Sequence, residues 1–148
     1  MRFIIVDIDG TIADISHRLP YLLKDKPLWD EFYLACPNDK PIWGVIELVK
    51  LLFQNGKNLI FVTGRDELIR EQTTAWIKEY VGIAVNETSL LMRKRKDNRP
   101  DEVVKKELLE QAGVKMDSIE FVLEDRKGVV DMWRKNNVLC LQVADGNF

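Results

Sequence analysis

Apolar residues gather in three short, nearly continuous runs along the chain, at residues 3–6, 59–62 and 119–123. Runs of this length without alternating polar positions are typical of strands that are covered on both faces, as in a parallel sheet. Two weaker runs of the same kind lie at residues 89–92 and 138–143. The pattern therefore predicts a mainly parallel sheet of about five strands.

Segments with helical periodicity separate these strands. The first places its apolar residues on one face and ends at Gly56, the second begins at Asp66, a residue suited to cap a helix, and the third lies between Pro100 and Gly113. The predicted helices are residues 41–55, 66–80, 101–111 and 126–136. Alternating strands and helices predict right-handed crossovers and a doubly wound α/β fold, with a ligand site beyond the carboxyl ends of the strands.

Residues 14–40 interrupt this alternation. The segment is too long for a simple strand-to-helix turn, and we expect one or two short helices that lie over the site as a flap or small cap. An ordinary surface insertion is the alternative. The aromatic residues Trp29, Phe32, Tyr33 and Trp43 could stack on a nucleobase or could serve only to pack this segment.

Composition limits the possible functions. The chain has 148 residues, the length of one domain, and its 46% hydrophobic and 31% charged residues exclude a disordered chain. No apolar run approaches the roughly 20 residues of a membrane span, and we expect neither a span nor a secretory signal. Cys36 and Cys140 are far apart and are expected to be reduced thiols of a cytoplasmic protein.

The net charge and the histidine content limit the possible functions further. A net charge of −2 gives no global cationic field, so a polyanion would have to bind locally. The basic run at residues 93–96 could guide a nucleic-acid backbone or could be a solvated loop. His17 is the single histidine, which argues against a histidine-rich zinc site and against a Ser-His-Asp hydrolase.

Two carboxylates follow the first predicted strand. Asp7 and Asp9 are two residues apart and project from the same face of an extended chain. Their mutual repulsion is relieved by a proton or a divalent cation, and Gly10 permits the tight turn that brings backbone close to a ligand. The alternative is a turn in which both side chains only cap backbone amides.

The ends of the other two main strands carry groups suited to metal and phosphate. The second strand is followed by Thr63, Gly64 and Arg65, and the third by Glu124, Asp125 and Arg126. Arg99 and Lys105 lie near the start of a predicted helix, where backbone amides favour anions. Asp101 precedes Lys105 by one helical turn, and we expect the two to pair.

These residues resemble a known family. The sequence Asp-Ile-Asp-Gly-Thr at residues 7–11, with Thr63, Lys105 and Glu124-Asp125, is similar in type and order to the four motifs of the haloacid dehalogenase superfamily of phosphotransferases. The resemblance covers the whole chain, 1–148, as one domain. More narrowly, Arg18 and residues 62–65, 99–105 and 124–134 resemble the 3′-phosphatase domain of phage polynucleotide kinase. Glu124 departs from a family motif that often carries two aspartates, and no phosphate-binding loop of a kinase is present.

The resemblance implies a mechanism and a set of site residues. Asp7 would be the nucleophile that becomes an aspartyl-phosphate, Asp9 the general acid and base, and Thr63 and Lys105 the groups that stabilise the phosphoryl oxygens. Mg²⁺ would be held by Asp7, by the backbone carbonyl of Asp9 and by Asp125. Asp101 and Glu124 would support the site, and the substrate would contact Arg18, Gly64, Arg65, Arg99 and Arg126.

The expected reaction is removal of a 3′-phosphate from the end of DNA or RNA. Two alternatives remain open at this point: a phosphatase for mononucleotides or other small phosphomonoesters, and a phosphate-binding module without catalysis.

Overall fold

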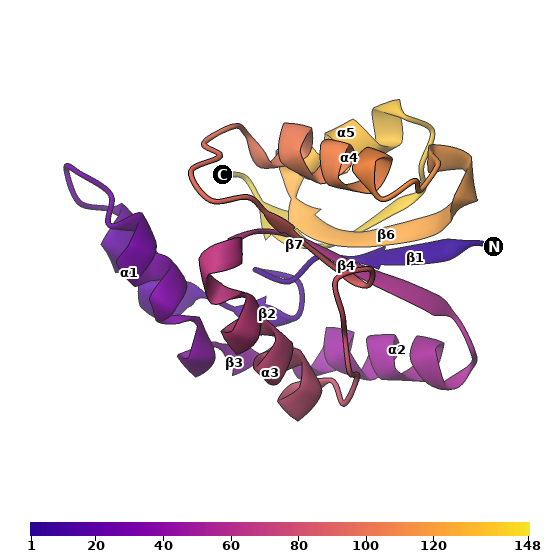
Figure 1. The fold of residues 1–148 in the computed structure, drawn as a ribbon, viewed down its shortest axis with the longest axis horizontal. Coiled ribbons are helices and arrows are strands. Elements are labelled where there is room, and N and C mark those ends of the chain that lie inside the picture. The colour runs from indigo at the N-terminus through magenta and orange to yellow at the C-terminus, as the bar shows by residue number, and fades with distance from the viewer.

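A five-stranded parallel sheet forms the centre of the molecule in a computed structural model that describes residues 1–148 (Figure 1). The strand order is β5-β4-β1-β6-β7, and every neighbouring pair is parallel. The strands are β1 (Phe3–Val6), β4 (Asn58–Asp66), β5 (Leu90–Arg93), β6 (Ile119–Arg126) and β7 (Cys140–Gly146). The predicted doubly wound α/β fold with five strands is confirmed.

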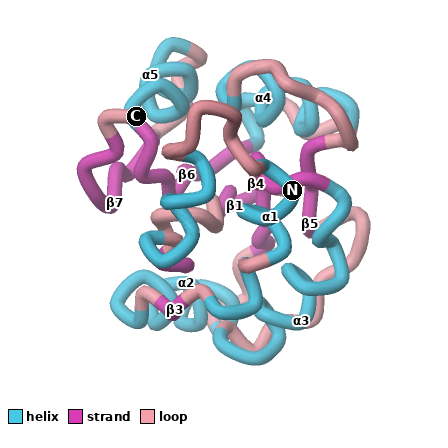
Figure 2. Tube along the Cα trace, turned by 90° about the vertical axis from the view of Figure 1, so that its left-hand side faces the viewer, coloured by secondary structure: helices cyan, strands magenta, loops and turns pink.

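Helices cover both faces of this sheet, as Figures 1 and 2 show. On one face lie α2 (Trp43–Gln54) and α3 (Arg70–Tyr80), and on the other α4 (Asp101–Gln111) and α5 (Lys127–Lys135). The central strand β1 contributes Ile4 and Val6 to the core on the first face and Ile5 to the core on the second. Its apolar run is thus explained, because both faces of the strand are buried.

One helix begins later than predicted. The segment expected to be helical from residue 66 starts with the end of β4 and a 3₁₀ turn at Glu67–Ile69, and α3 begins only at Arg70. Asp66 still belongs to the sheet, where it pairs with Arg93 of β5. Its carboxylate accepts a hydrogen bond from the amide of Leu68 at 2.8 Å, so it caps the 3₁₀ turn.

Residues 14–40, called the insertion below, leave the sheet after β1. A short antiparallel pair, β2 (Ala13–Asp14) and β3 (Lys40–Pro41), closes its base. Between these strands lie two 3₁₀ segments, Ser16–Leu22 and Cys36–Asn38, and the short helix α1 (Trp29–Leu34). In Figure 1 the insertion extends to one side of the sheet, at the left of the view. No helix of the chain has the length and apolar character of a membrane span.

Candidate active site

Three buried carboxylates meet where β1 and β6 end. Asp7 follows β1, and Glu124 and Asp125 lie near the end of β6, its parallel neighbour. One carboxylate oxygen of each lies within 4.8 Å of the others. The hydroxyl of Thr11 donates to Asp7 Oδ2 at 2.7 Å and lies 3.4 Å from Asp125 Oδ1. The convergence of acidic groups predicted for these strand ends is therefore present.

Lys105 of α4 supplies a positive charge to this cluster. Its Nζ donates to Asp7 Oδ1 at 2.7 Å and to Glu124 Oε2 at 2.8 Å. Burial alone would lower the pKa of Lys105, but the carboxylates of Asp7 and Glu124 outweigh burial and raise it, so the side chain remains an ammonium.

The predicted pair between Asp101 and Lys105 is wrong. Asp101 instead accepts hydrogen bonds from Arg93, at the end of β5, and from Arg126, at the end of β6, the latter at 2.8 Å. Spacing on a helix allowed the pair, but the buried carboxylates of the cluster attract the ammonium more strongly than Asp101 does, whose side chain is 22% exposed and pairs with two arginines.

The residues of the cluster fit a divalent metal ion. Burial and the charge of Asp7 raise the pKa of Asp125 from 3.8 to about 7, and the same causes raise the pKa of Glu124 well above its usual value. One ammonium cannot balance three ionised carboxylates, and the remaining two negative charges match a dication. Carboxylate oxygens are the donors that Mg²⁺ prefers.

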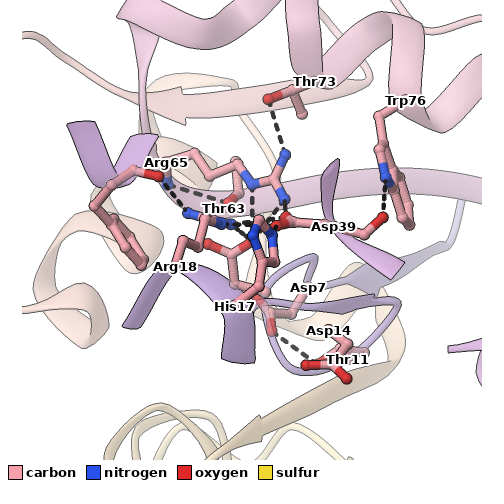
Figure 3. Close-up of polar contacts among 12 residues, drawn as sticks. Asp7, Thr11, Asp14, His17, Arg18, Asp39, Thr63, Arg65, Thr73 and Trp76 are labelled. Atoms are coloured by element: carbon pink, nitrogen blue, oxygen red, sulfur yellow. Dashed lines mark hydrogen bonds and ion pairs between the residues drawn. The ribbon is translucent and has the colours of Figure 1, made fainter. Parts of the chain in front are cut away.

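Two arginines hold Asp9, Arg18 of the insertion and Arg65 of β4, and Figure 3 shows both of them gathered around Asp39. Its Oδ1 accepts from Arg18 Nη2 at 2.9 Å and from Arg65 Nε at 2.8 Å. Behind them, Asp39 accepts from Nε and Nη2 of Arg18, both at 2.8 Å, and from Nη2 of Arg65 at 2.7 Å. Thr73 of α3 accepts from Arg65 Nη1 at 3.1 Å. A buried charge network therefore fixes the position of Asp9.

This network gives Arg18 and Arg65 a place different from the predicted one. Both guanidinium groups are fully buried, and neither lines the cleft described below. Their donors point to carboxylates because a buried arginine needs compensating charge. They act on Asp9 in this geometry, where direct contact with substrate phosphate was expected.

Asp9 itself reaches the cleft. Burial would raise its pKa, but Arg65 and Arg18 more than offset that effect and lower it, so the carboxylate is ionised at neutral pH. The side chain is 22% exposed, and Oδ2 has no partner within the protein.

Sequence reasoning missed Asp39, and it considered Arg93 only as part of a basic run. Asp39 lies 26 positions from Arg65 and belongs to no motif, and His17 is its third partner at 2.7 Å. Arg93 is buried at the end of β5 and donates to the carbonyls of Gly64, Asp97 and Arg99 at 2.7 to 2.9 Å. For Arg93 the sequence offered two signals, its place in the basic run at residues 93–96 and its position just past the predicted strand at residues 89–92, and neither indicated its contacts with backbone carbonyls.

A cleft of ≈ 680 Å³ opens above the carboxylates. Its floor holds Asp7, Asp9, Thr63, Lys105 and Asp125. The side formed by the insertion is largely apolar, with Ile15, Leu19, Leu22, Trp29, Phe32 and Tyr33. The opposite side carries the basic residues Arg93, Arg95, Lys96, Arg99 and Arg126, with the acidic residues Asp97 and Asp101 among them.

The remaining predicted substrate contacts lie in this cleft. The hydroxyl of Thr63 accepts from the amide of Arg65 at 3.1 Å, which leaves its proton available to a ligand. A side chain at Gly64 would collide with Asp101, because a Cβ there would lie 2.6 Å from Oδ1. Arg99 and Arg126 line the cleft as expected, although both also pair with protein carboxylates.

Comparison with solved structures identifies the class of this fold. A predicted phosphatase from Clostridium acetobutylicum superposes with a TM-score of 0.67, over 95% of this chain and 83% of its own. The sequence identity is 14%, so this likeness shows a shared fold only. The same fold occurs in solved structures of haloacid dehalogenase-like hydrolases, from Streptococcus pneumoniae with a TM-score of 0.63 and from Entamoeba histolytica with a TM-score of 0.65. All 148 residues also match the family model described as the polynucleotide kinase PNKP phosphatase domain. The chain therefore belongs to that family and is a phosphatase domain.

Closer relatives come from nucleic-acid repair. A chain in the structure of the Pnkp1/Rnl/Hen1 RNA repair complex is 32% identical, with a TM-score of 0.83 over 99% of this chain and 43% of that chain. A predicted bifunctional polynucleotide kinase/RNA ligase of Autographa californica nuclear polyhedrosis virus is 28% identical over 134 residues, which are 90% of this chain and 18% of the viral protein. This chain thus spans less than half the length of these relatives.

Proposed function

We propose that this domain removes the 3′-phosphate from nucleic-acid ends, with Mg²⁺ as cofactor and through an aspartyl-phosphate on Asp7. The observation that carries the proposal is the position of Asp7, which lies on the floor of the cleft between Lys105 and the carboxylate of Asp125. The relatives named for polynucleotide kinases and RNA repair support nucleic acid as the substrate class.

Asp7 is the nucleophile. Its carboxylate attacks phosphorus in line with the leaving 3′-oxygen, so that one P–O bond forms as the other breaks. The ammonium of Lys105 orients Asp7 by donating to its Oδ1 and stabilises the charge on the phosphoryl oxygens, and the hydroxyl of Thr63 donates to one of these oxygens.

Asp9 moves the protons. It donates a proton to the leaving oxygen and then accepts one from the water that hydrolyses the aspartyl-phosphate. Arg18 and Arg65 orient its Oδ1 and leave Oδ2 for this task. Because a bound phosphate is negatively charged, it raises the pKa of Asp9 and favours the protonated form that the first step needs.

Mg²⁺ would be held by Asp7, by Asp125 and by the backbone carbonyl of Asp9. When bound, it neutralises charge so that an anionic nucleophile can approach an anionic phosphate. Glu124 stays with Lys105, at 2.8 Å, and holds that ammonium beside Asp7.

The test is a panel of three substrates with and without Mg²⁺: a 3′-phosphorylated oligonucleotide, a 3′-mononucleotide and an aryl phosphate. We expect the oligonucleotide to have the highest kcat/KM and a chelator to abolish turnover. Higher efficiency on the mononucleotide would reassign the enzyme to small phosphomonoesters, and turnover of none would make it a phosphate-binding module.

Asp7→Asn tests the covalent step. The substitution keeps the size of the side chain but removes the nucleophile, so we expect kcat to fall by at least about 10³-fold. Asp131→Asn, at an exposed position of α5, is the matched control and should leave turnover unchanged. Substantial activity of Asp7→Asn would contradict the mechanism.

A further inference from the structure

The two sides of the cleft carry more side chains for ligand contacts than a phosphate group alone requires. The carboxylates, Lys105 and Thr63 on the floor suffice for the metal and the phosphoryl group. Above them, an apolar side built by the insertion faces a basic side built by the segment that follows β5. Apolar and cationic surfaces that face each other across one groove match a chain of bases and phosphates.

Trp29 presents an indole ring to this groove. It is 51% exposed and lines the cleft, while Phe32 and Tyr33 support it with ring centroids at 5.9 and 6.0 Å. A ring held in this way loses little freedom when a ligand stacks on it. Trp43 is equally exposed, at 52%, but lies on α2 outside the cleft.

Tyr33 adds a polar atom to the same side. Its side chain is only 9% exposed and lines the cleft, and its hydroxyl makes no hydrogen bond to another residue of the chain. Burial raises its pKa to about 12, so the hydroxyl is a neutral donor. The hydroxyl is therefore free to donate a hydrogen bond to a ligand atom in the cleft.

Arg95 and Lys96 are the available cations of the basic side. Arg93, Arg99 and Arg126 donate to carboxylates at the cleft rim. Lys96 has no ion pair, and a positive φ of 63° turns the backbone at its position. Arg95 is 45% exposed and makes only two long contacts, with the exposed Asp30 at 3.3 Å and with the buried Asp66 at 3.4 Å. Asp66 keeps its hydrogen bond from the amide of Leu68, so a phosphate can take over the guanidinium.

We infer that the cleft contains a subsite for the terminal nucleoside, formed by Trp29 and Tyr33, and a second subsite for the phosphodiester that precedes it, formed by Arg95 and Lys96. The preferred substrate is then a single-stranded end of at least two nucleotides, because a base that stacks on Trp29 must be free of its own helix. This inference rests on the proposed function, which puts the 3′-phosphate on the floor of the cleft.

The experiment measures binding separately from turnover. A fluorescein-labelled trinucleotide with a 3′-phosphate is titrated by fluorescence anisotropy against the Asp7→Asn protein with Mg²⁺. In this background Trp29→Ala should weaken binding about tenfold. Tyr33→Phe, which keeps the ring, should weaken it about fivefold.

Lys96→Ala reports on the second subsite. It should weaken binding severalfold and should reduce the slope of log affinity against log salt by about 0.7, the value for one lost contact with single-stranded phosphate. Two control variants match the residues tested: Trp43→Ala for the exposed indole and Lys94→Ala for the exposed lysine, which lies outside the cleft. Both should bind like the parent protein.

The outcomes separate the inference from the proposed function. Equal effects of Trp29→Ala and Trp43→Ala, or a 3′-mononucleotide that binds as tightly as the trinucleotide, would overturn the subsites even if the wild-type protein is an active phosphatase. The expected binding pattern in a protein that turns over no phosphomonoester would instead refute the proposed catalysis and leave the subsites standing.

Discussion

At the scale of single residues, Gly10 allows the carboxylate of Asp125 to approach the loop after β1. It has a φ of +81°, and a Cβ at this position would lie 2.0 Å from Asp125 Oδ2. Gly10→Ala should therefore reduce Mg²⁺ affinity and turnover and should lower the free energy of unfolding by about 2–4 kcal/mol, through backbone strain and displacement of Asp125. Urea denaturation and Mg²⁺ titration measure both effects.

Gly56 provides the control for this prediction. Its φ of +77° is almost the same, but nothing lies within 4 Å of the Cβ that a substitution would add. Gly56→Ala should therefore show the backbone strain alone, about 1 kcal/mol, with unchanged Mg²⁺ affinity. Equal losses of unfolding free energy in the two variants would mean that the close approach of Asp125 to Gly10 does not contribute to the effect.

Asp39 is the residue on which the position of Asp9 depends. Asp39→Ala would leave Arg18 and Arg65 buried without their shared carboxylate, and we expect a loss of about 3–5 kcal/mol in the free energy of unfolding. Asp39→Asn keeps the shape of the side chain, so we expect a smaller loss of stability than in Asp39→Ala. We still expect a lower kcat, measured at a temperature well below the unfolding midpoint.

A surface pair gives the comparison for Asp39. Glu120 pairs with Lys57 at 3.1 Å, and both side chains are partly exposed. Glu120→Gln should change the free energy of unfolding by less than about 1 kcal/mol and should leave kcat as it is. An Asp39→Asn protein with wild-type kcat would show that the network does not position Asp9.

At the scale of elements, Asp101 joins the first turn of α4 to the ends of β5 and β6. It accepts from Arg93 and Arg126, so Asp101→Asn should loosen residues 94–99, which Arg93 also holds through backbone carbonyls. We expect faster amide hydrogen exchange in these residues and lower turnover, while the pair of Lys105 with Asp7 remains. Glu110→Gln, which affects an exposed pair with Lys106 on the same helix, is the control, and equal exchange in both variants would contradict the prediction.

The hydrophobic pattern correctly predicts the parts of a strand that are buried on both faces. It fails at strand ends that polar residues extend. The centre of each main strand was found from its apolar run, because both faces are covered. The ends of β4 and β6 were placed too early, since Asp66 and Arg126 stay in the sheet through pairing with Arg93 and Gly146. Polar residues that pair at a sheet edge carry no hydrophobic signal.

The candidate site shows the same division. Asp7, Asp9, Lys105 and Asp125 could be found because they follow strands or begin a helix, and the carboxyl ends of parallel strands meet. Asp39 could not, because its partners are distant in sequence and the fold of the insertion alone brings them together. Helical spacing likewise suggested a partner for Lys105 but carried no information on the competing buried carboxylates.

At the scale of the whole molecule, a near-neutral chain separates its charges into an acidic floor and a basic side of one cleft, and the acidic floor makes stability depend on pH and metal. Burial and the charge of Asp7 raise the pKa of Asp125 from 3.8 to about 7. Between these values the folded chain holds a proton that the unfolded chain releases, so the contribution of Asp125 to stability falls as pH rises from about 4 to 7. Mg²⁺ held by the deprotonated carboxylate, as proposed above, would reverse this loss.

The gain in Tm on adding saturating Mg²⁺ should therefore be larger at pH 7.5 than at pH 5.5, because at the lower pH a proton competes with the metal for Asp125. Differential scanning fluorimetry at constant ionic strength measures the gain, with Na⁺ in place of Mg²⁺ as the reference. Asp125→Asn, which removes both the ligand charge and the titrating group, should show little gain at either pH. An equal gain at the two pH values in the wild-type protein would mean that Asp125 is not a ligand of the metal.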